Sequence, residues 1–351
     1  MPAAVASHPE PSPLHVATSG ARINVAALAA AAAAAATLCM PVAPAIAAER
    51  PAGYPAQPVR LVVPFPPGGT SDIVARVIGQ RLSTTVGQRF VVENRPGAGA
   101  AIGIVAVTSA TPDGQTILMG SAGPLTMSPH MGKVPYVVDR DLATVALITA
   151  VPNIAVVHPS VPAKTLADMV KLVQARPGSV SFGSAGQGTT AHLSGELFRT
   201  LAGGQMIHVP YKGTSAAVSD LVGGQIDMLI DNLPGVLPQV RAGKLRALAL
   251  ASPARSKAAP DVPSAAEAGM KDLLVSGWFG FLSPAKTPAP INEWLAQEMI
   301  AAAKVPEVQA QLADLGGELD LKGPAEFRTY LRAESDRWAK IISAAKLAIP
   351  Q

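Results

Sequence analysis

The stretch that decides the fold is Val59–Asp72, which reads VRLVVPFPPGGTSD. Its first five residues form an apolar run that is typical of a buried strand, and the run Pro66–Gly69 ends that strand. Apolar residues then recur at helical spacing over residues 73–82, and Gly87 ends the helix. The stretch therefore predicts a strand, a glycine-rich loop and a helix, which is the unit of parallel α/β sheets.

This alternation continues along the chain in two blocks. Strands are expected at 89–93 and 115–119, and again at 180–182, 206–209, 226–230 and 245–250. Between the blocks, Leu142–Val157 holds two apolar runs split by Pro152-Asn153, and a third apolar run at 273–282 precedes terminal helices at 291–304, 307–315 and 325–346. A sheet that restarts between two extended crossings predicts an inserted domain. We expect domain I at 49–150 and 276–351, and domain II at 151–275, each with a mostly parallel sheet flanked by helices.

The first 48 residues are predicted to be a cleavable signal peptide. Arg22 precedes an apolar, alanine-rich run over 25–42, and Ala45-Ile46-Ala47 has the small-x-small pattern that signal peptidase reads. The alternative is a membrane anchor, which normally needs about 20 more strongly apolar residues. The single cysteine, Cys39, lies in this segment behind Leu38, so we expect neither lipid attachment nor any disulfide in the exported chain.

Composition argues against two further classes of protein. The chain carries a net charge of +4 without a basic run, and only 4% of its residues are aromatic, so a nucleic-acid surface is not expected. The histidines outside the first 48 residues are scattered, without paired spacing or an acidic cluster, so neither a metal site nor a metal cofactor is expected. They are His130, His158, His192 and His208.

Two loops carry the pattern of an anion site. In both Pro66–Asp72 and Phe182–His192 a strand leads into a helix, so backbone N–H groups and the helix dipole meet at the carboxyl end of the strand. The alternative for the first loop is a tight turn with a capping residue. The second loop contains G-x-G-x-x-A at 186–191, but the following strand, IHVPYK, lacks the acid that holds the ribose of NAD. Anion binding without a dinucleotide cofactor is the remaining prediction.

The motifs support a catalytic function less well than anion binding. The run Gly183–Gly186 falls one residue short of the hydrolase motif G-x-S-x-G, which makes a hydrolase using Ser184 the competing class of function. His192 is expected to orient its loop, and Asp231 to act as a single hydrogen-bond acceptor in the cleft. The cluster Trp278, Phe279 and Phe281 is interpreted as core.

Six motifs in order make the sequence similar to a known family. They are PFPPGGTSD (64–72), VENRPGAG (92–99), GSAGQGTTAHL (183–193), VPYKG (209–213), GGQID (223–227) and GKLRALA (243–249). Together they resemble the Bug-type substrate-binding proteins of tripartite tricarboxylate transporters, from about Tyr54 to Lys346. One departure is YVVDRD at 136–141, where family members usually read closer to Tyr-Asp-Pro.

This resemblance implies a periplasmic, two-lobed "Venus flytrap" of the periplasmic-binding-protein type (type II-like). It implies a small organic carboxylate gripped, partly through ordered waters, by the loops Pro66–Asp72 and Ser184–Thr189, and delivery to membrane permease subunits. Family ligands include tricarboxylates, dicarboxylates, acidic amino acids and aromatic carboxylates. A sensor that presents ligand to a two-component system would share these features. The candidate ligand-binding residues are Phe65, Pro66, Pro67, Gly68, Gly69, Thr70, Ser71, Asp72, Gly123, Ser184, Ala185, Gly186, Gln187, Gly188, Thr189, His192, Tyr211 and Asp231. No catalytic residue, metal or cofactor is expected.

Overall fold

The computed structural model describes residues 49–314, 316–344 and 347. The strands are β1 (Val59–Val63), β2 (Phe90–Asn94), β3 (Thr116–Ser121), β4 (Leu142–Val157), β5 (Val180–Ser184), β6 (Met206–Pro210), β7 (Met228–Asn232), β8 (Arg246–Leu250), β9 (Ser276–Pro284) and β10 (Glu318–Lys322). The α-helices are α2 (Thr70–Val86), α3 (Ala101–Thr108), α4 (Ser128–Met131), α5 (Val138–Asp141), α6 (Leu166–Ala175), α7 (Thr190–Ala202), α8 (Thr214–Val222), α9 (Leu233–Arg241), α10 (Ala289–Ala303), α11 (Pro306–Asp314) and α12 (Pro324–Ala344). Two short helical segments, η1 (Ala98–Ala100) and η2 (Gly123–Met127), complete the described elements. The predicted signal peptide lies outside the described residues. No described helix is both long and apolar enough to span a bilayer.

The described strands form one ten-stranded sheet in the order β2-β1-β3-β9-β4-β7-β5-β6, with β10 and β8 also paired to β4. The strands β1, β2 and β3 pair in parallel, as do β5, β6 and β7. These two groups carry the strand–helix units that the sequence predicts. The crossing strands β4 and β9 run antiparallel to their neighbours, so the sheet as a whole is mixed.

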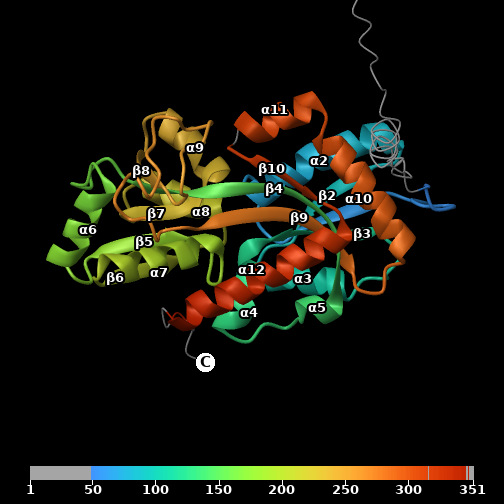
Figure 1. Cartoon of the computed structure of the whole chain (residues 1–351), viewed down its shortest axis with the longest axis horizontal. Helices are drawn as coiled ribbons and strands as arrows, with labels where there is room; N and C mark the ends of the chain where they lie inside the picture. The colour runs from blue at the N-terminus through green and yellow to red at the C-terminus, as the bar shows by residue number, and fades with distance from the viewer. Residues whose placement is uncertain (1–48, 315, 345–346, 348–351) are drawn as a thin grey trace, which may run out of the picture. The chain divides into compact units, whose positions relative to one another are not determined.

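Strand β4 joins two lobes. It is continuous over 16 residues, so the predicted split at Pro152-Asn153 is wrong as a break in the strand. Its residues from Leu142 to Pro152 pair with β9, and from Asn153 onward they pair with β7. Figure 1 shows β4 and β9 running through the middle, with β1–β3 on one side and β5–β7 on the other. We call the part built on β1, β2, β3, β9 and β10 the first lobe, and the part built on β5 to β8 the second lobe.

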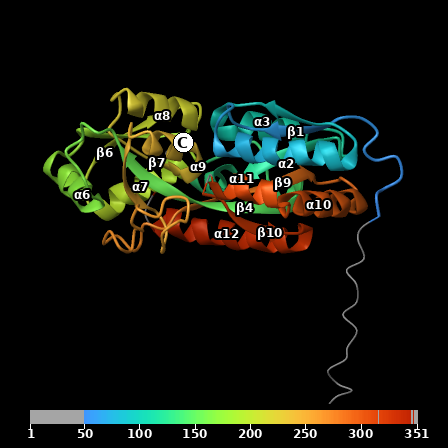
Figure 2. The same ribbon diagram turned by 90° about the horizontal axis from the view of Figure 1, so that it is seen from above.

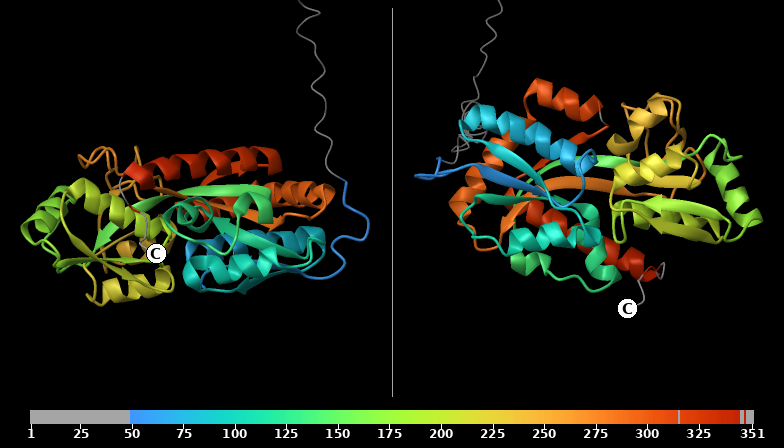
Figure 3. Two further views of the ribbon diagram at one scale, coloured as in Figure 1. Left: turned by 90° about the horizontal axis from the view of Figure 1, so that it is seen from below. Right: turned by 180° about the vertical axis from the view of Figure 1, so that it is seen from behind.

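Helix α12 packs along β4 on the face opposite α2 and α8 (Figures 2 and 3). Its buried residues Phe327, Leu331, Trp338 and Ile342 recur at helical spacing, so one stripe of the helix faces the core.

The short segments η1, η2, α4 and α5 were not predicted, and neither were strand β10 and helix α9. Strand β10 reads ELDLK, and its apolar–polar alternation suits a half-buried edge strand, which pairs antiparallel with β4. Helix α9 contains Pro234 near its start and Pro238 inside it, so its composition indicates a loop. It forms because its apolar residues Leu233, Val236 and Leu237 pack in the core of the second lobe.

Candidate functional site

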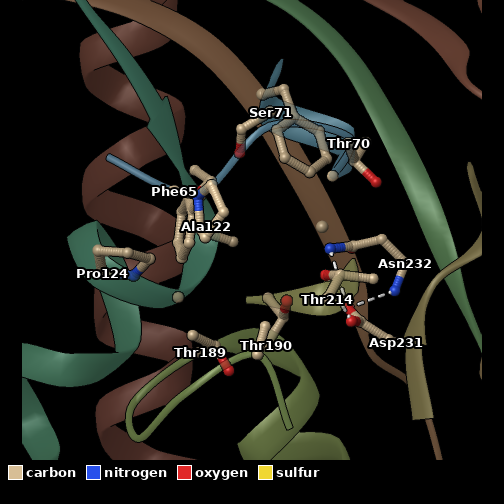
Figure 4. A pocket seen from close by; sticks show the side chains of 17 residues that line it. Phe65, Thr70, Ser71, Ala122, Pro124, Thr189, Thr190, Thr214, Asp231 and Asn232 are labelled. Atoms are coloured by element: carbon tan, nitrogen blue, oxygen red, sulfur yellow. Dashed lines mark hydrogen bonds between the residues drawn. The ribbon is translucent and has the colours of Figure 1, made fainter. Parts of the chain in front are cut away.

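A small cavity lies between the two lobes, at the carboxyl ends of the parallel strands (Figure 4). Its volume is about 40 Å³, measured as the space that the centre of a water-sized group can occupy. The first lobe contributes Phe65, Pro66, Gly69, Thr70, Ser71, Ser121, Ala122, Gly123, Pro124, Gly277 and Phe279 to its lining. The second lobe contributes Ala185, Thr189, Thr190, Thr214, Asp231 and Asn232. Open α/β sheets bind their ligands at this edge.

The structure divides the predicted site residues into three groups. Lining the cavity are Phe65, Pro66, Gly69, Thr70, Ser71, Gly123, Ala185, Thr189 and Asp231. Lining an adjacent, more open pocket of about 440 Å³, which shares Phe65 and Ala185 with the cavity, are Gly186, Gln187, Gly188 and Tyr211. Lining neither are Pro67, Gly68, Asp72, Ser184 and His192.

The first loop presents an uncapped helix end to the cavity. Gly69 is the N-cap of α2 and provides no side-chain cap, so the N–H groups of the first turn keep their hydrogen-bonding capacity for a ligand. The hydroxyl of Thr70, on the same turn, is buried and has no hydrogen-bond partner. This end of α2 is therefore suited to an anion.

Asp72 fixes this loop from behind. Its carboxylate accepts hydrogen bonds from Gly68 N (3.0 Å), Arg76 Nε (3.0 Å) and Asn94 Nδ2 (2.9 Å). Burial alone would raise the pKa of Asp72, but the bonds from Arg76, Gly68 and Asn94 outweigh it, so the pKa lies below its usual value. Asp72 is thus ionised, and its carboxylate oxygens hold the loop to α2 and β2.

The second loop is held by neutral groups. Thr189 is the N-cap of α7; its hydroxyl accepts from His192 N and donates to Gly186 O over 2.7 Å. Gly188 N donates to His192 Nδ1 over 3.2 Å. The ring of His192 stacks on that of His208, with centroids 4.1 Å apart, and burial lowers the pKa of each to about 4. Both rings are therefore neutral at pH 7, as the predicted orienting role of His192 requires.

The lobes touch across the cavity. Ser128 of the first lobe donates to Gly188 O (3.0 Å), and Ser215 of the second lobe donates to Pro67 O (3.2 Å). A Cβ on Gly123 would come within 2.8 Å of Thr189 Cα and Thr190 N, so the absence of a side chain there permits the approach. These contacts define a closed arrangement of the lobes.

Asp231, at the end of β7, supplies the only carboxylate among the lining residues. It is 1% exposed. Thr214 Oγ1 donates to its Oδ2 and Asn232 N to its Oδ1, each over 2.7 Å (Figure 4). Burial raises its pKa to about 6, although these two hydrogen bonds act in the opposite sense. No Lys, Arg or His is found among the lining residues.

Sequence reasoning missed eight lining residues: Ser121, Ala122, Pro124, Thr190, Thr214, Asn232, Gly277 and Phe279. Most of them lie at the carboxyl ends of β3 and β7 or in the loops and helix starts that follow β3, β5 and β6. The antiparallel pairings β3–β9, β9–β4 and β4–β7 make the two parallel groups run in opposite directions, so that their carboxyl ends face each other across the cavity. The signal was therefore available, because ligands of α/β sheets bind at the carboxyl ends of the parallel strands. Phe279 was assigned to the core; it does pack there, but it also lines the cavity.

The two lobes, the paired crossing strands and the cavity between the lobes define a solute-binding protein of the periplasmic-binding-protein class. Residues 74–347 match the tripartite tricarboxylate transporter family receptor, and the chain belongs to that family of periplasmic solute-binding receptors. BugT of Bordetella pertussis is 38% identical over 298 residues, which cover 84% of this chain and 91% of BugT. This confirms the resemblance given by the six motifs.

Solved structures agree with this assignment. Rpa4515 of R. palustris with adipate superposes with a TM-score of 0.82 at 34% identity, covering 84% of this chain and 99% of that one. MatC (Rpa3494) from Rhodopseudomonas palustris with bound malate gives a TM-score of 0.80 at 32% identity, covering 82% of this chain and 100% of that one. The predicted two-lobed fold is confirmed.

Proposed function

We propose that this protein captures a small organic carboxylate in the cavity between its lobes and delivers it to a membrane transporter, without catalysing a reaction on it. The observation that carries the proposal is the convergence of helix ends: α2, α7 and α8 all begin at residues that line the cavity. Three positive helix ends, of which those of α2 and α8 carry no side-chain cap, can bind a carboxylate without a lysine or arginine.

The relatives support the ligand class. Rpa4515 was solved with adipate and MatC with malate, and both are dicarboxylates. A ligand of this size that touches both lobes would bind the closed form better than an open form. The proposed ligand-binding residues are those of the two loops that line the cavity, together with Gly123 and Asp231.

The competing proposal, a hydrolase, has one observation in its favour. Ser184 Oγ lies 2.7 Å from His208 Nε2, which is the distance expected of a nucleophile and its base. Ser184 is completely buried, however, and lines neither the cavity nor the adjacent pocket. A substrate carbonyl cannot approach this hydroxyl. The pair is better explained as part of the structure that fixes the second loop.

The test is a thermal-shift screen on protein that has been unfolded, dialysed and refolded to remove any ligand that co-purified. Carboxylic acids such as malate, succinate and adipate should raise the melting temperature, whereas their amides and neutral sugars should not. A neutral sugar that gives the largest shift would overturn the proposal. Mass spectrometry of the molecule released on unfolding identifies the natural ligand, and an unchanged ligand after hours of incubation excludes turnover.

We propose that the lobes correspond to the predicted domains, 49–150 with 276–351 and 151–275, and that they move about β4 and the start of β9. The pairing partners of β4 change between Pro152 and Asn153, and Ser276 pairs with Pro152 at the same point. Small-angle scattering should give a smaller radius of gyration with malate than without. Identical scattering in both states, with binding verified by calorimetry, would contradict the hinge.

The proposed export and partner follow from the family and from residues 1–48. Fractionation of the native host should find the protein in the periplasm, cleaved near residue 48, and deletion of residues 1–48 should retain it in the cytoplasm. Deletion of the permease subunits encoded in the same genome should abolish ligand uptake. Uptake that persists, with loss of a transcriptional response instead, would favour the sensor role.

A further inference from the structure

Asp231 is an unexpected residue in a site for an anion. It lies at the end of β7, beside the N-terminus of α8 and directly before α9. Thr214 Oγ1 and Asn232 N take one position on each carboxylate oxygen, and Asn232 Nδ2 lies 3.4 Å from Oδ1. An ionised carboxylate offers about four acceptor positions, so Oδ2 keeps one for the cavity that Asp231 lines.

The charge of Asp231 is not balanced by a neighbouring cation. The elements packed against β7 are β4, β5, α7, α8 and α9, and β4 and β5 contain no ionisable side chain. On α7, Glu196 pairs with Arg199 and faces His192; on α8, Asp220 accepts from Tyr211; on α9, Arg241 donates to Ala258 O. None of these groups lines the cavity or contributes to the pKa shift of Asp231.

A second acceptor in the cavity has no donor at all. Asn232 Oδ1 is buried without a hydrogen-bond partner. The amide orientation is set by the contact of Nδ2 with Asp231, and Oδ1 is so close to Gly277 that a Cβ on that residue would overlap it. A buried acceptor without a donor is unfavourable. Asn232 Oδ1 and the unfilled position on Asp231 Oδ2 therefore both favour a ligand group that donates a hydrogen bond.

We propose that Asp231 is a specificity-determining residue, which selects carboxylic acids that carry a hydrogen-bond donor, such as a hydroxyl or an ammonium group, over acids that carry none. The inference rests on the proposed function and adds a requirement to it. The helix ends of α2, α7 and α8 bind the carboxylate, and the donor on the same molecule binds Asp231 Oδ2. A dicarboxylate without such a donor can form a hydrogen bond with Asp231 only when one of the two carboxyl groups is protonated. Its binding therefore weakens as the pH rises.

The experiment is isothermal titration calorimetry on the refolded protein with two matched pairs of acids, malate with succinate and lactate with propionate. In any pair that binds, the hydroxy acid should have at least about tenfold higher affinity than the plain acid near pH 8. The reason is that the plain acid offers no hydrogen-bond donor to the carboxylate of Asp231. Near pH 5.5 the difference should shrink, since a proton can then be shared. This pH profile of the unaltered protein needs no variant.

The variant Asp231→Asn replaces the carboxylate with a neutral amide of the same shape. It should reduce the preference for the hydroxy acid to within about twofold and remove the pH dependence of the plain acid. The matched control is Asp220→Asn, which removes a charge from α8 that contacts Tyr211 and not the cavity; it should leave the preference unchanged.

Two results would overturn the inference while leaving the proposed function intact: equal affinities within each pair near pH 8, or a preference that persists unchanged in Asp231→Asn. Binding of neither pair, nor of any acid in the thermal-shift screen, would instead overturn the proposed function and this inference together. A neutral sugar that binds more tightly than every acid has the same consequence.

Discussion

The loops Pro66–Asp72 and Ser184–Thr189 each aim a helix N-terminus at the same cavity, but different forces hold them in place. The first loop is fixed by an ionised carboxylate, Asp72, which receives charged and neutral donors. The second is fixed by hydroxyl and imidazole groups that stay neutral at pH 7. A rigid anion site can therefore be built with or without a charge, and the two versions should respond differently to mutation and acid.

The largest effect is expected where the first loop loses its anchor. Asp72→Ala should lower the free energy of unfolding by about 2–3 kcal/mol, because Gly68 N and Asn94 lose a charged acceptor. Urea denaturation measures the change. The matched control is Asp139→Ala, which removes an exposed ion pair with Arg332 and should cost about 1 kcal/mol or less. Equal losses in both variants would show that Asp72 is not a structural anchor.

The next largest effect is expected from glycine substitutions, which should weaken ligand binding in the second loop more than in the first. Gly188 has φ +79°, and a Cβ there would overlap Ser128 Oγ of the first lobe, so Gly188→Ala should weaken ligand binding on the order of tenfold by resisting closure. Gly69 has φ −85°, and its added Cβ would meet only Thr214 at 4.0 Å, so Gly69→Ala should bind nearly as the unaltered protein does.

Calorimetry with malate or the natural ligand checks this difference. Gly203→Ala is the control for backbone strain alone, because Gly203 has φ +67° with no atom near its added Cβ and lies at the far end of α7. It should reduce stability without changing affinity. A stronger loss of affinity in Gly69→Ala than in Gly188→Ala would reverse the comparison.

Acid should loosen the second loop before the first. The folded pKa of His192 is about 4, below its unfolded value of about 6.5, so the unfolded chain binds the extra proton and stability falls as the pH drops from about 6.5 to 4. Asp72 has a lowered pKa, so its contribution is present above about pH 3.9 and is lost only below it. Between about pH 6.5 and 4, His192→Gln should reduce the slope of the unfolding free energy against pH by at most about 1.4 kcal/mol per pH unit.

Thermal unfolding between pH 7 and 3 measures both windows. The lower window should remain in His192→Gln, because Asp72 is unchanged. An identical slope between pH 6.5 and 4 in the variant and the unaltered protein would contradict the role of His192.

The smallest effects are expected at the serines that link each loop to the opposite lobe. Ser128→Ala removes the bond to Gly188 O, and Ser215→Ala removes the longer and more exposed bond to Pro67 O. Each should weaken ligand binding by about two- to tenfold, with Ser128 the larger, because a neutral hydrogen bond contributes about 0.5–1.5 kcal/mol. Ser160→Ala, on the surface of the second lobe away from the cavity, should leave affinity unchanged.

The sequence predicted the parts of the site that depend on one strand and the helix after it. Gly69, Thr70 and Thr189 lie where the periodicity of their own segments places them. The sequence could not show which other residues of these loops line the cavity and which point away from it. The side chain of Asp72, for example, turns toward Asn94 on the neighbouring strand β2. Such contacts depend on which strands are neighbours in the sheet.

The missed residues have the same origin. Thr214 and Asn232 reach the cavity only because the carboxyl ends of β6 and β7 face that of β1, and that arrangement requires the antiparallel crossing through β4 and β9. Strand β10 was missed because its alternating pattern is only five residues long and stands between two helices. Its pairing with β4 is a long-range choice that local propensity does not record.

The pairing of β4 with β9 also sets an order of assembly. Leu142 pairs with Pro284, so the sheet of the first lobe stays open in the middle until residue 284 has been synthesised. The second lobe has its strand partners within residues 153–250 and can collapse as a unit beforehand. We expect β9 to close the middle of the sheet by pairing along a strand that the second lobe has already aligned, before β10 and α12 add to β4. A nascent chain that lacks β9 would thus expose the edges of β3 and β4, which keeps the first lobe unfolded for as long as the chain is incomplete.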